Sequence, residues 1–156
     1  MIDDVTFLIR VIIALILGGI IGFERQYRNR HAGMRTFAII CVSSSVLTTI
    51  GLYVISIYKQ HDISYFLLGI ILSIGFLSSG LIYKEFINGK NIVFGLTTAS
   101  VLIITSIIGI FVGLGLYSKA VILFVVVIFT LFIFRGFELK LGLKKMIYLE
   151  DSDKNN

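Results

Sequence analysis

The sequence predicts an all-α integral membrane protein, built as a bundle of about five transmembrane helices in one domain. Hydrophobic residues make up 57% of its 156 residues and charged residues only 15%, with a mean hydropathy of +0.99. A soluble protein of this size could not bury so much apolar surface, because its surface-to-volume ratio is too high. The apolar runs are continuous rather than alternating, which disfavours a β-barrel. We therefore expect lipid to be the solvent for this surface.

Crossing the hydrocarbon takes about 20 helical residues, and five apolar segments are long enough or nearly so. The acidic start, Met1-Ile2-Asp3-Asp4, lacks the basic region of a signal peptide, so we expect the first segment to be a permanent helix. A transmembrane domain is expected over 1–137, followed over 138–156 by a short cytoplasmic tail that is first basic and amphipathic and then disordered. The five expected helices are 5–23, 36–58, 65–83, 95–117 and 118–136.

The basic residues predict the orientation of the helices. With the N-terminus outside and the C-terminus in the cytoplasm, eleven of the fourteen Lys and Arg residues lie inside, and only Arg10, Lys59 and Lys119 lie outside. The net charge of +5 therefore indicates topology and contact with anionic lipid, and we expect no nucleic acid partner. Arg10 lies about two turns from the outer end of its helix, where we expect it to extend to the headgroups.

The sequence shows no positive sign of an enzyme. Its single cysteine, Cys41, lies inside an apolar run and is expected to be a buried, inert thiol. His31 and His61 are predicted on opposite sides of the membrane, so a zinc site is not expected. No serine stands in a nucleophile elbow and no His–Asp pairing suggests a base. We expect no catalytic residue, metal or cofactor.

The charged segment Gly18–Thr36 connects the first two apolar segments and permits two interpretations. It forms either a solvated loop with an ordinary surface ion pair of little energetic value, or a junction at which a partly buried Glu24 is clamped by Arg25, Arg35 or both. Charged groups at membrane depth are candidates for function. The candidate functional junction consists of Glu24, Arg25, Gln26, Arg35 and Thr36.

Small and hydroxyl residues recur inside the expected helices. Glycines at helical spacing let helix backbones approach closely, within the chain or in a homodimer. Hydroxyls by default bond across helices or back to carbonyls of their own helix, and the alternative is a polar path for an ion. Candidate packing positions are Gly18, Gly19, Gly22, Gly75, Gly80, Gly95, Gly109 and Gly113, and the candidate polar path is Ser43, Ser44, Thr97 and Thr98.

Two stretches of the chain are similar to each other. Gly19–Glu24 is similar to Gly80–Glu85, and 32–38 is similar to 94–100. Both copies would begin on the outside, so the first two helices and the next two would form a parallel repeat about an axis along the membrane normal. The hypothesis requires the two inner connections to follow the same path.

Six motifs occur in a fixed order over roughly residues 8–130. They are Gly19-x-x-Gly22-x-Glu24-Arg25-Gln26, Ala32-Gly33-x-Arg35-Thr36, Ile74-Gly75-Phe76-Leu77 with Gly80, Gly95-Leu96-Thr97-Thr98-Ala99, Ile108-Gly109 and Gly113-Leu114-Gly115-Leu116-Tyr117. Together these motifs resemble the MgtC/SapB family of bacterial inner-membrane proteins. The chain departs from the family pattern at Ser78-Ser79, near the place of a usual small residue, and at Phe94, which replaces a usual arginine.

The resemblance implies a multi-pass protein of the inner membrane that is linked to stress adaptation at low magnesium and, in pathogens, is associated with virulence through survival inside host cells. Larger members carry a soluble C-terminal domain, which is not expected here. Mg²⁺ prefers carboxylate ligands, yet no Asp or Glu lies in the middle of an expected helix. We therefore expect a homodimer in the lipid bilayer that regulates another membrane protein or complex. A small transporter or channel for Mg²⁺ or another ion is the alternative.

Overall fold

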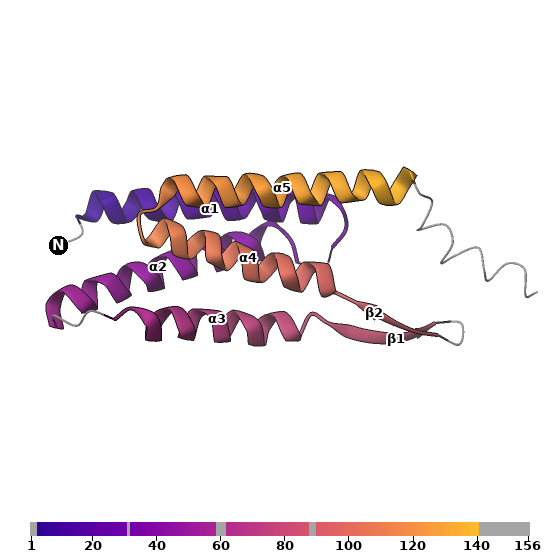
Figure 1. Cartoon of the computed structure of the whole chain (residues 1–156), viewed down its shortest axis with the longest axis horizontal. Helices are drawn as coiled ribbons and strands as arrows, with labels where there is room; N and C mark the ends of the chain where they lie inside the picture. The colour runs from indigo at the N-terminus through magenta and orange to yellow at the C-terminus, as the bar shows by residue number, and fades with distance from the viewer. Residues whose placement is uncertain (1–2, 31, 59–61, 88–89, 141–156) are drawn as a thin grey trace, which may run out of the picture.

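A computed structural model describes residues 3–30, 32–58, 62–87 and 90–140, which form five helices and one β-hairpin along a common long axis (Figure 1). Successive helices run in opposite directions, so the 28–33 connection, the hairpin and the end of α5 lie at one end of the bundle. We call this the basic end. The fold confirms the predicted helical bundle, with α1 at Asp4–Tyr27, α2 at Met34–Tyr58, α3 at Ser64–Ser79, α4 at Leu96–Gly113 and α5 at Tyr117–Lys140.

Three of these helices, α1, α2 and α4, are long and apolar enough to cross a membrane. The helix α3 and the apolar part of α5, Tyr117–Ile133, are shorter. At 1.5 Å per residue, the 16 residues of α3 span about 24 Å, slightly less than a hydrocarbon core of about 30 Å. These helices support a multi-pass membrane protein, and the orientation with the N-terminus outside remains a prediction.

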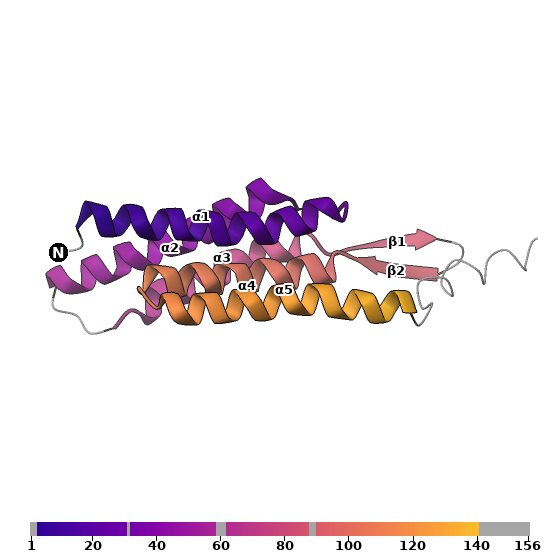
Figure 2. The same ribbon diagram turned by 90° about the horizontal axis from the view of Figure 1, so that it is seen from above.

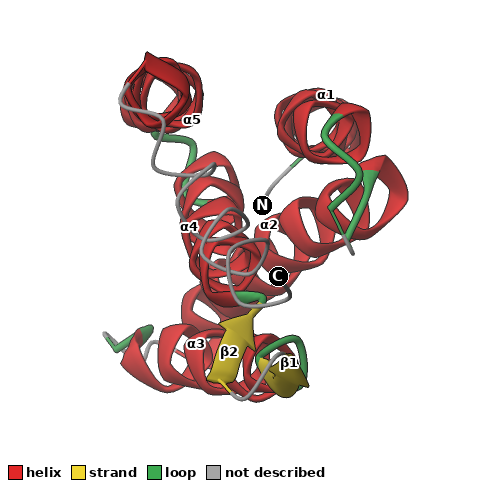
Figure 3. Ribbon diagram, turned by 90° about the vertical axis from the view of Figure 1, so that its right-hand side faces the viewer, coloured by secondary structure: helices red, strands yellow, loops and turns green. Residues whose placement is uncertain are grey.

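The helix α2 lies at the centre of the packing, between α1 and α4. The end-on view shows α3 and α5 on different sides of α4 (Figure 3), and the view from above shows the elongated bundle that results (Figure 2). A fully buried Phe37 from α2 packs with Ile21 from α1, and Leu102 and Ile108 from α4 belong to the same core. The site described below lies between these three helices.

Glycines set the distance between α1 and α2. A Cβ added at Gly18 would lie 2.6 Å from Cys41 Cβ, and one at Gly22 would lie 2.6 Å from Met34 Cα. Real carbon atoms approach to about 3.5 Å at best. The α1–α2 contact therefore depends on the absence of a side chain at both positions.

The interface between α2 and α4 uses glycine in the same way. A Cβ at Gly113 would lie 2.5 Å from Ser45 O, and a Cβ at Gly109 would collide with Cys41 O. Without a hydrophobic effect between helices in lipid, such close backbone contact supplies van der Waals attraction. The two glycine pairs thus bring α1, α2 and α4 together.

A β-hairpin, not anticipated from the sequence, connects α3 and α4. The strands β1 (Tyr83–Ile87) and β2 (Lys90–Phe94) pair antiparallel, from Tyr83 opposite Phe94 to Ile87 opposite Lys90. The rings of Tyr83 and Phe94 stack with centroids 5.5 Å apart. The helix predicted over 65–83 was therefore too long, because α3 ends at Ser79 and the hairpin extends from the basic end (Figure 1).

The hypothesis of a parallel repeat is wrong at the two connections on which it depended. Glu24 lies in the helix α1, whereas Glu85, its supposed equivalent, lies in the strand β1. The first connection, 28–33, is short, and the second contains the hairpin. Similar short apolar sequences thus adopt different structures because their tertiary surroundings differ.

Several expectations concern residues outside the described part of the chain. The predicted tail covers 138–156, and its residues from 141 onward lie outside the described part of the chain. The expected domain boundary therefore stays a prediction. His31 and His61, which were expected on opposite sides of the membrane, also lie outside the described residues.

Candidate functional site

The last two turns of α1 hold two buried charged residues. Glu24 is 7% exposed and Arg25 is 2% exposed. The Glu24 carboxylate forms an ion pair with Arg28 Nε, one turn further along. The structure thus favours a buried Glu24 over a solvated loop, but the partner is Arg28, and the expected clamp by Arg25 or Arg35 is wrong.

Arg28 in turn attaches α1 to α5. Its Nη1 donates a hydrogen bond of 3.1 Å to the carbonyl oxygen of Leu131, and its guanidinium lies 5.0 Å from the ring centroid of Phe132. Cation–π contact of this kind adds about 0.5–2 kcal/mol, the larger value when water is excluded. Arg28 therefore shares its charge between a carboxylate, a carbonyl group and an aromatic ring.

Arg25 points into the bundle. Its Nη2 donates a buried hydrogen bond of 3.0 Å to Thr98 Oγ1, in the first turn of α4. A hydrogen bond from a charged group contributes about 1.5–3 kcal/mol, and a buried charge without partners is far more costly. The pair therefore fixes the basic end of α1 against the start of α4.

The remaining members of the predicted junction are Gln26, near the end of α1, and Arg35 and Thr36, in the first turn of α2. Gln26 Oε1 accepts a hydrogen bond of 3.2 Å from the backbone N–H of Met34 and so satisfies one free donor of this helix. Arg35 and Thr36 are exposed. Within the described residues, the Arg35 side chain has no hydrogen bond or ion pair. The predicted junction therefore divides into two buried residues on α1, Glu24 and Arg25, and three exposed residues around the start of α2.

At the opposite end of the bundle, Arg10 also points inward. Its Nη1 donates a hydrogen bond of 2.7 Å to Gly113 O and lies 3.4 Å from Thr49 Oγ1. The prediction that Arg10 extends to the headgroups was therefore wrong. Arg10 points inward because the free carbonyl groups at the C-terminus of α4 carry partial negative charge and attract a cation.

Between Arg25 and Arg10, buried hydroxyl groups follow the contact of α2 with α4; we call them the polar strip. Thr48 and Thr105 donate to the carbonyl oxygens of Ser44 and Val101 four residues earlier, with oxygen–oxygen distances of 2.7 Å. Such bonds satisfy a hydroxyl within its own helix. The strip consists of Ser44, Ser45, Thr48, Thr49, Thr98, Thr105 and Ser106.

Only some residues of the predicted polar path are buried, and only some of the predicted packing glycines contact another helix. Ser44 and Thr98 belong to the polar strip, whereas Ser43 and Thr97 are exposed. Gly19 and Gly75 have no atom within 4 Å of an added Cβ, so neither packs closely against another helix among the described residues. Gly80, the C-cap of α3, would meet only the carbonyl oxygen of Leu77 in its own helix, at 3.5 Å.

Gly95 serves a turn rather than a helix contact. It is the N-cap of α4 with φ of +88°, and an added Cβ would collide with the carbonyl oxygen of Leu81. Only glycine adopts this conformation without strain. Gly95 thereby directs the chain from the hairpin into α4 and brings Thr98 to Arg25.

Sequence reasoning missed Arg28 and the hairpin. Arg28 lies at i+4 from Glu24, a spacing at which opposite charges on one helix meet, and this was the available signal. The register of the hairpin leaves two residues, Asn88 and Gly89, between the strands. Asn-Gly is the commonest sequence of a two-residue hairpin loop, so this signal was also present.

The sequence is similar to a known protein family and to several curated proteins. The model of the MgtC family matches residues 11–139. The chain is 36% identical over 115 residues to Protein MgtC of Brucella abortus, which covers 74% of this chain and 45% of the relative. It is 31% identical over 150 residues to Protein SrpB of Synechococcus elongatus, covering 92% of this chain and 79% of the relative.

A third relative carries a name that refers to magnesium. The chain is 35% identical over 120 residues to "Putative magnesium transporter YhiD" of Escherichia coli, covering 74% of this chain and 54% of the relative. The chain thus spans about half the length of several curated relatives that it matches. No solved structure matches it.

Proposed function

Because the chain belongs to the MgtC family of bacterial membrane proteins, we propose that it is a non-enzymatic protein that supports adaptation to low magnesium by regulating another membrane protein. The name of the Escherichia coli relative refers to magnesium. In this proposal the chain itself does not carry the ion. Regulation would operate through helix contacts in the bilayer.

The observation that carries the proposal is the arginine at each end of the polar strip. A cation that entered the strip would meet Arg25 at one end and Arg10 at the other, each held by hydrogen bonds inside the bundle. Fixed positive charge in a narrow passage excludes cations. Glu24, a buried carboxylate next to Arg25, is already paired with Arg28.

The ligands that Mg²⁺ needs also argue against ion passage through the polar strip. Mg²⁺ requires octahedral oxygen coordination and releases its water reluctantly, which favours carboxylates. Within the described residues, no group of three or more His, Cys, Asp or Glu side chains is placed to hold a metal ion. The hydroxyls of Thr48 and Thr105 are occupied within their own helices. The polar strip thus supports helix packing better than ion passage.

We propose that a second copy of the chain packs on α3. Gly69 and Ser73, one turn apart, are both exposed on this helix, and a Cβ at Gly69 would meet no atom within 4 Å. A small-xxx-small pair allows a second helix backbone to approach closely in lipid. Large exposed side chains flank the pair, including Leu72 at 63% and Phe76 at 80% exposure.

Growth at low magnesium tests the regulatory role. In a strain that lacks the native gene, wild-type protein should restore growth at low magnesium, whereas Glu24→Gln and Arg35→Ala should not restore it. Membrane levels of each variant, measured by immunoblot, separate loss of function from loss of protein. Lys84→Ala, which removes an exposed cation from β1 at the same basic end but outside the junction, measures the effect of a neutral substitution. Full growth with both Glu24→Gln and Arg35→Ala would refute the assignment of the junction.

The alternative function is transport of Mg²⁺ or another ion. It is favoured by the polar strip itself, in which the hydroxyls of Ser45 and Ser106 have no hydrogen-bond partner among the described residues. The alternative predicts ion flux through the purified protein. Regulation predicts, instead, that cross-linking in native membranes captures a specific partner protein and that the purified chain carries no flux.

A further inference from the structure

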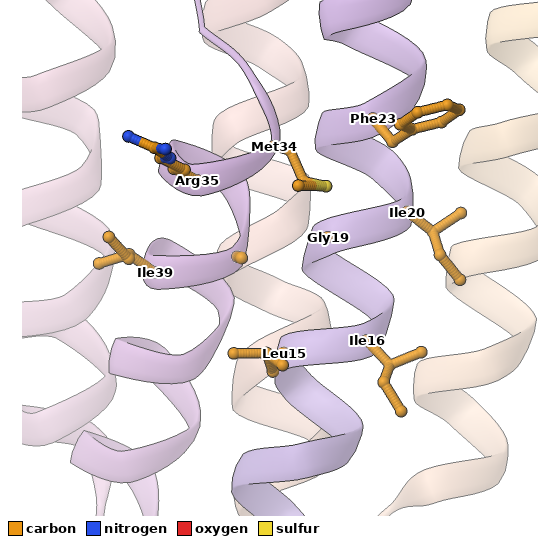
Figure 4. Close-up of a pocket in the computed structure, with 9 residues that line it drawn as sticks. Leu15, Ile16, Gly19, Ile20, Phe23, Met34, Arg35 and Ile39 are labelled. Atoms are coloured by element: carbon orange, nitrogen blue, oxygen red, sulfur yellow. The ribbon is translucent and has the colours of Figure 1, made fainter.

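An apolar groove of about 700 Å³ lies between α1 and α2 (Figure 4). Its volume falls within the 300–1,000 Å³ that is typical of ligand-sized sites. The two ridges of the groove are formed by large side chains from the two helices, and Gly19 and Ala38 leave room between them. The lining residues are Leu15, Ile16, Gly19, Ile20, Phe23, Met34, Arg35, Ala38 and Ile39.

The groove has the length and direction of a lipid chain within one leaflet. Met34 and Arg35 lie at the level of Phe23, toward the basic end, and Leu15 and Ile16 lie at the other end (Figure 4). From Phe23 to Leu15 the helix rises about 12 Å, while one leaflet of the hydrocarbon is about 15 Å thick. The groove therefore begins near the headgroup level and ends before the middle of the bilayer.

The charge at the rim indicates the type of headgroup. Arg25 and Arg28 use their guanidinium groups inside the protein, whereas Arg35 is an exposed cation without a hydrogen bond or ion pair among the described residues. Basic residues between transmembrane helices at headgroup depth bind anionic lipid headgroups. Arg35 is thus a suitable partner for a phosphate group.

The shape of the groove disfavours a transmembrane helix as its occupant. A helix packs closely on a glycine when the residues one turn away are also small. The neighbours of Gly19 at that spacing, Leu15 and Phe23, are instead large and 53% and 61% exposed. The small pair of this helix, Gly18 and Gly22, is already used by α2. Flexible acyl chains can fill the irregular space that remains.

We infer that this groove is a binding site for an anionic glycerophospholipid, with an acyl chain between α1 and α2 and its phosphate on Arg35. The site shares Arg35 with the proposed junction, but lipid binding there does not depend on the regulatory role. It gives a role to Arg35, whose side chain forms no hydrogen bond or ion pair among the described residues. The lipid would cover apolar surface at Gly19 that no helix in the described part of the chain covers.

Photolabelling tests the site. The purified full-length protein is reconstituted in phosphatidylcholine vesicles that contain a small fraction of phosphatidylglycerol with a mid-chain diazirine, and the adducts are mapped by mass spectrometry. We expect adducts to be concentrated on 15–23 and 34–39 and to be displaced by unlabelled phosphatidylglycerol. If the exposed faces of α3 and α5 were labelled as strongly as the groove, the inference would be overturned. Efficient cross-linking of groove positions to a second copy would also overturn it.

Matched variants separate the contribution of the lipid headgroup to binding from that of the acyl chain. Arg35→Gln should lower groove labelling about fivefold, the effect of one basic residue near an anionic headgroup, and Arg35→Lys should retain most of it. Lys119→Gln, which removes an exposed cation at the opposite end, should leave labelling unchanged. Equal loss in Arg35→Gln and Lys119→Gln would indicate unspecific attraction and would overturn the inference.

A second pair of variants tests where the acyl chain of the lipid binds. Gly19→Leu fills the groove, whereas Gly75→Leu adds the same side chain to α3, where an added Cβ also meets no atom within 4 Å. We expect groove labelling to fall at least fivefold in the first variant and to stay unchanged in the second. Equal labelling in both variants would contradict the site.

Discussion

Two adjacent glycines of α1 allow a direct test of the helix packing. A Cβ at Gly18 would lie 2.6 Å from Cys41 Cβ and 2.7 Å from Phe37 O, whereas a Cβ at Gly19 would meet no atom within 4 Å. Relieving the first contact to about 3.5 Å requires α1 and α2 to separate by about 1 Å. Overpacking of this kind costs about 1–3 kcal/mol, and the gain in helix propensity from Gly to Ala offsets about 0.5–1 kcal/mol.

We therefore expect Gly18→Ala to lower the free energy of unfolding by about 1–2 kcal/mol, and Gly19→Ala to leave it unchanged or raise it by up to about 1 kcal/mol. Unfolding of the purified protein in mixed micelles of mild detergent and SDS, followed by circular dichroism, measures both. The two variants share the helix, the depth and the chemical change, so their difference isolates the contact with α2. Equal stability of the two variants would refute the close α1–α2 packing.

Three further substitutions test the contacts that orient the site. Thr98→Val should lower the free energy of unfolding by about 1.5–3 kcal/mol, because it leaves a buried Arg25 donor without its partner, and Thr97→Val, at an exposed position, should change it by less than about 0.5 kcal/mol. Gly95→Ala should cost more than about 2 kcal/mol through its positive φ and the collision with a carbonyl oxygen, and should lower the monodisperse yield in size-exclusion chromatography. Arg10→Met should cost about 1–2 kcal/mol in the same unfolding assay by removing a cation from the C-terminus of α4. A wild-type unfolding curve for Thr98→Val or Arg10→Met, or a normal yield of Gly95→Ala, would contradict the contact concerned.

The helices were predictable because their signal is the sum of many residues. Each of the five apolar segments contains enough Ile, Leu, Val and Phe for lipid to be the only adequate solvent, and small local irregularities do not change that balance. The hairpin depends instead on two strands of five residues, Tyr83–Ile87 and Lys90–Phe94. Its apolar residues continue the pattern of the preceding helix, so hydropathy alone could not separate strand from helix.

The direction of individual side chains was less predictable, because it depends on how the helices pack. Ser43 and Ser44 are neighbours of the same type, yet one is exposed and the other belongs to the polar strip. Arg10 was expected at the lipid headgroups because a long basic side chain near a helix end can generally reach them. The C-terminal carbonyl of Gly113 offers a specific solution, which is visible only once α1 and α4 are brought together.

The central claim is that the chain regulates another protein and does not itself carry magnesium. Its most direct test is uptake of Mg²⁺ into proteoliposomes that contain the purified full-length protein and an entrapped magnesium-sensitive dye. We predict uptake no faster than in protein-free vesicles, because Arg10 and Arg25 place fixed positive charge at both ends of the polar strip. Uptake that saturates with Mg²⁺ concentration and is abolished by Glu24→Gln would contradict the account and establish transport.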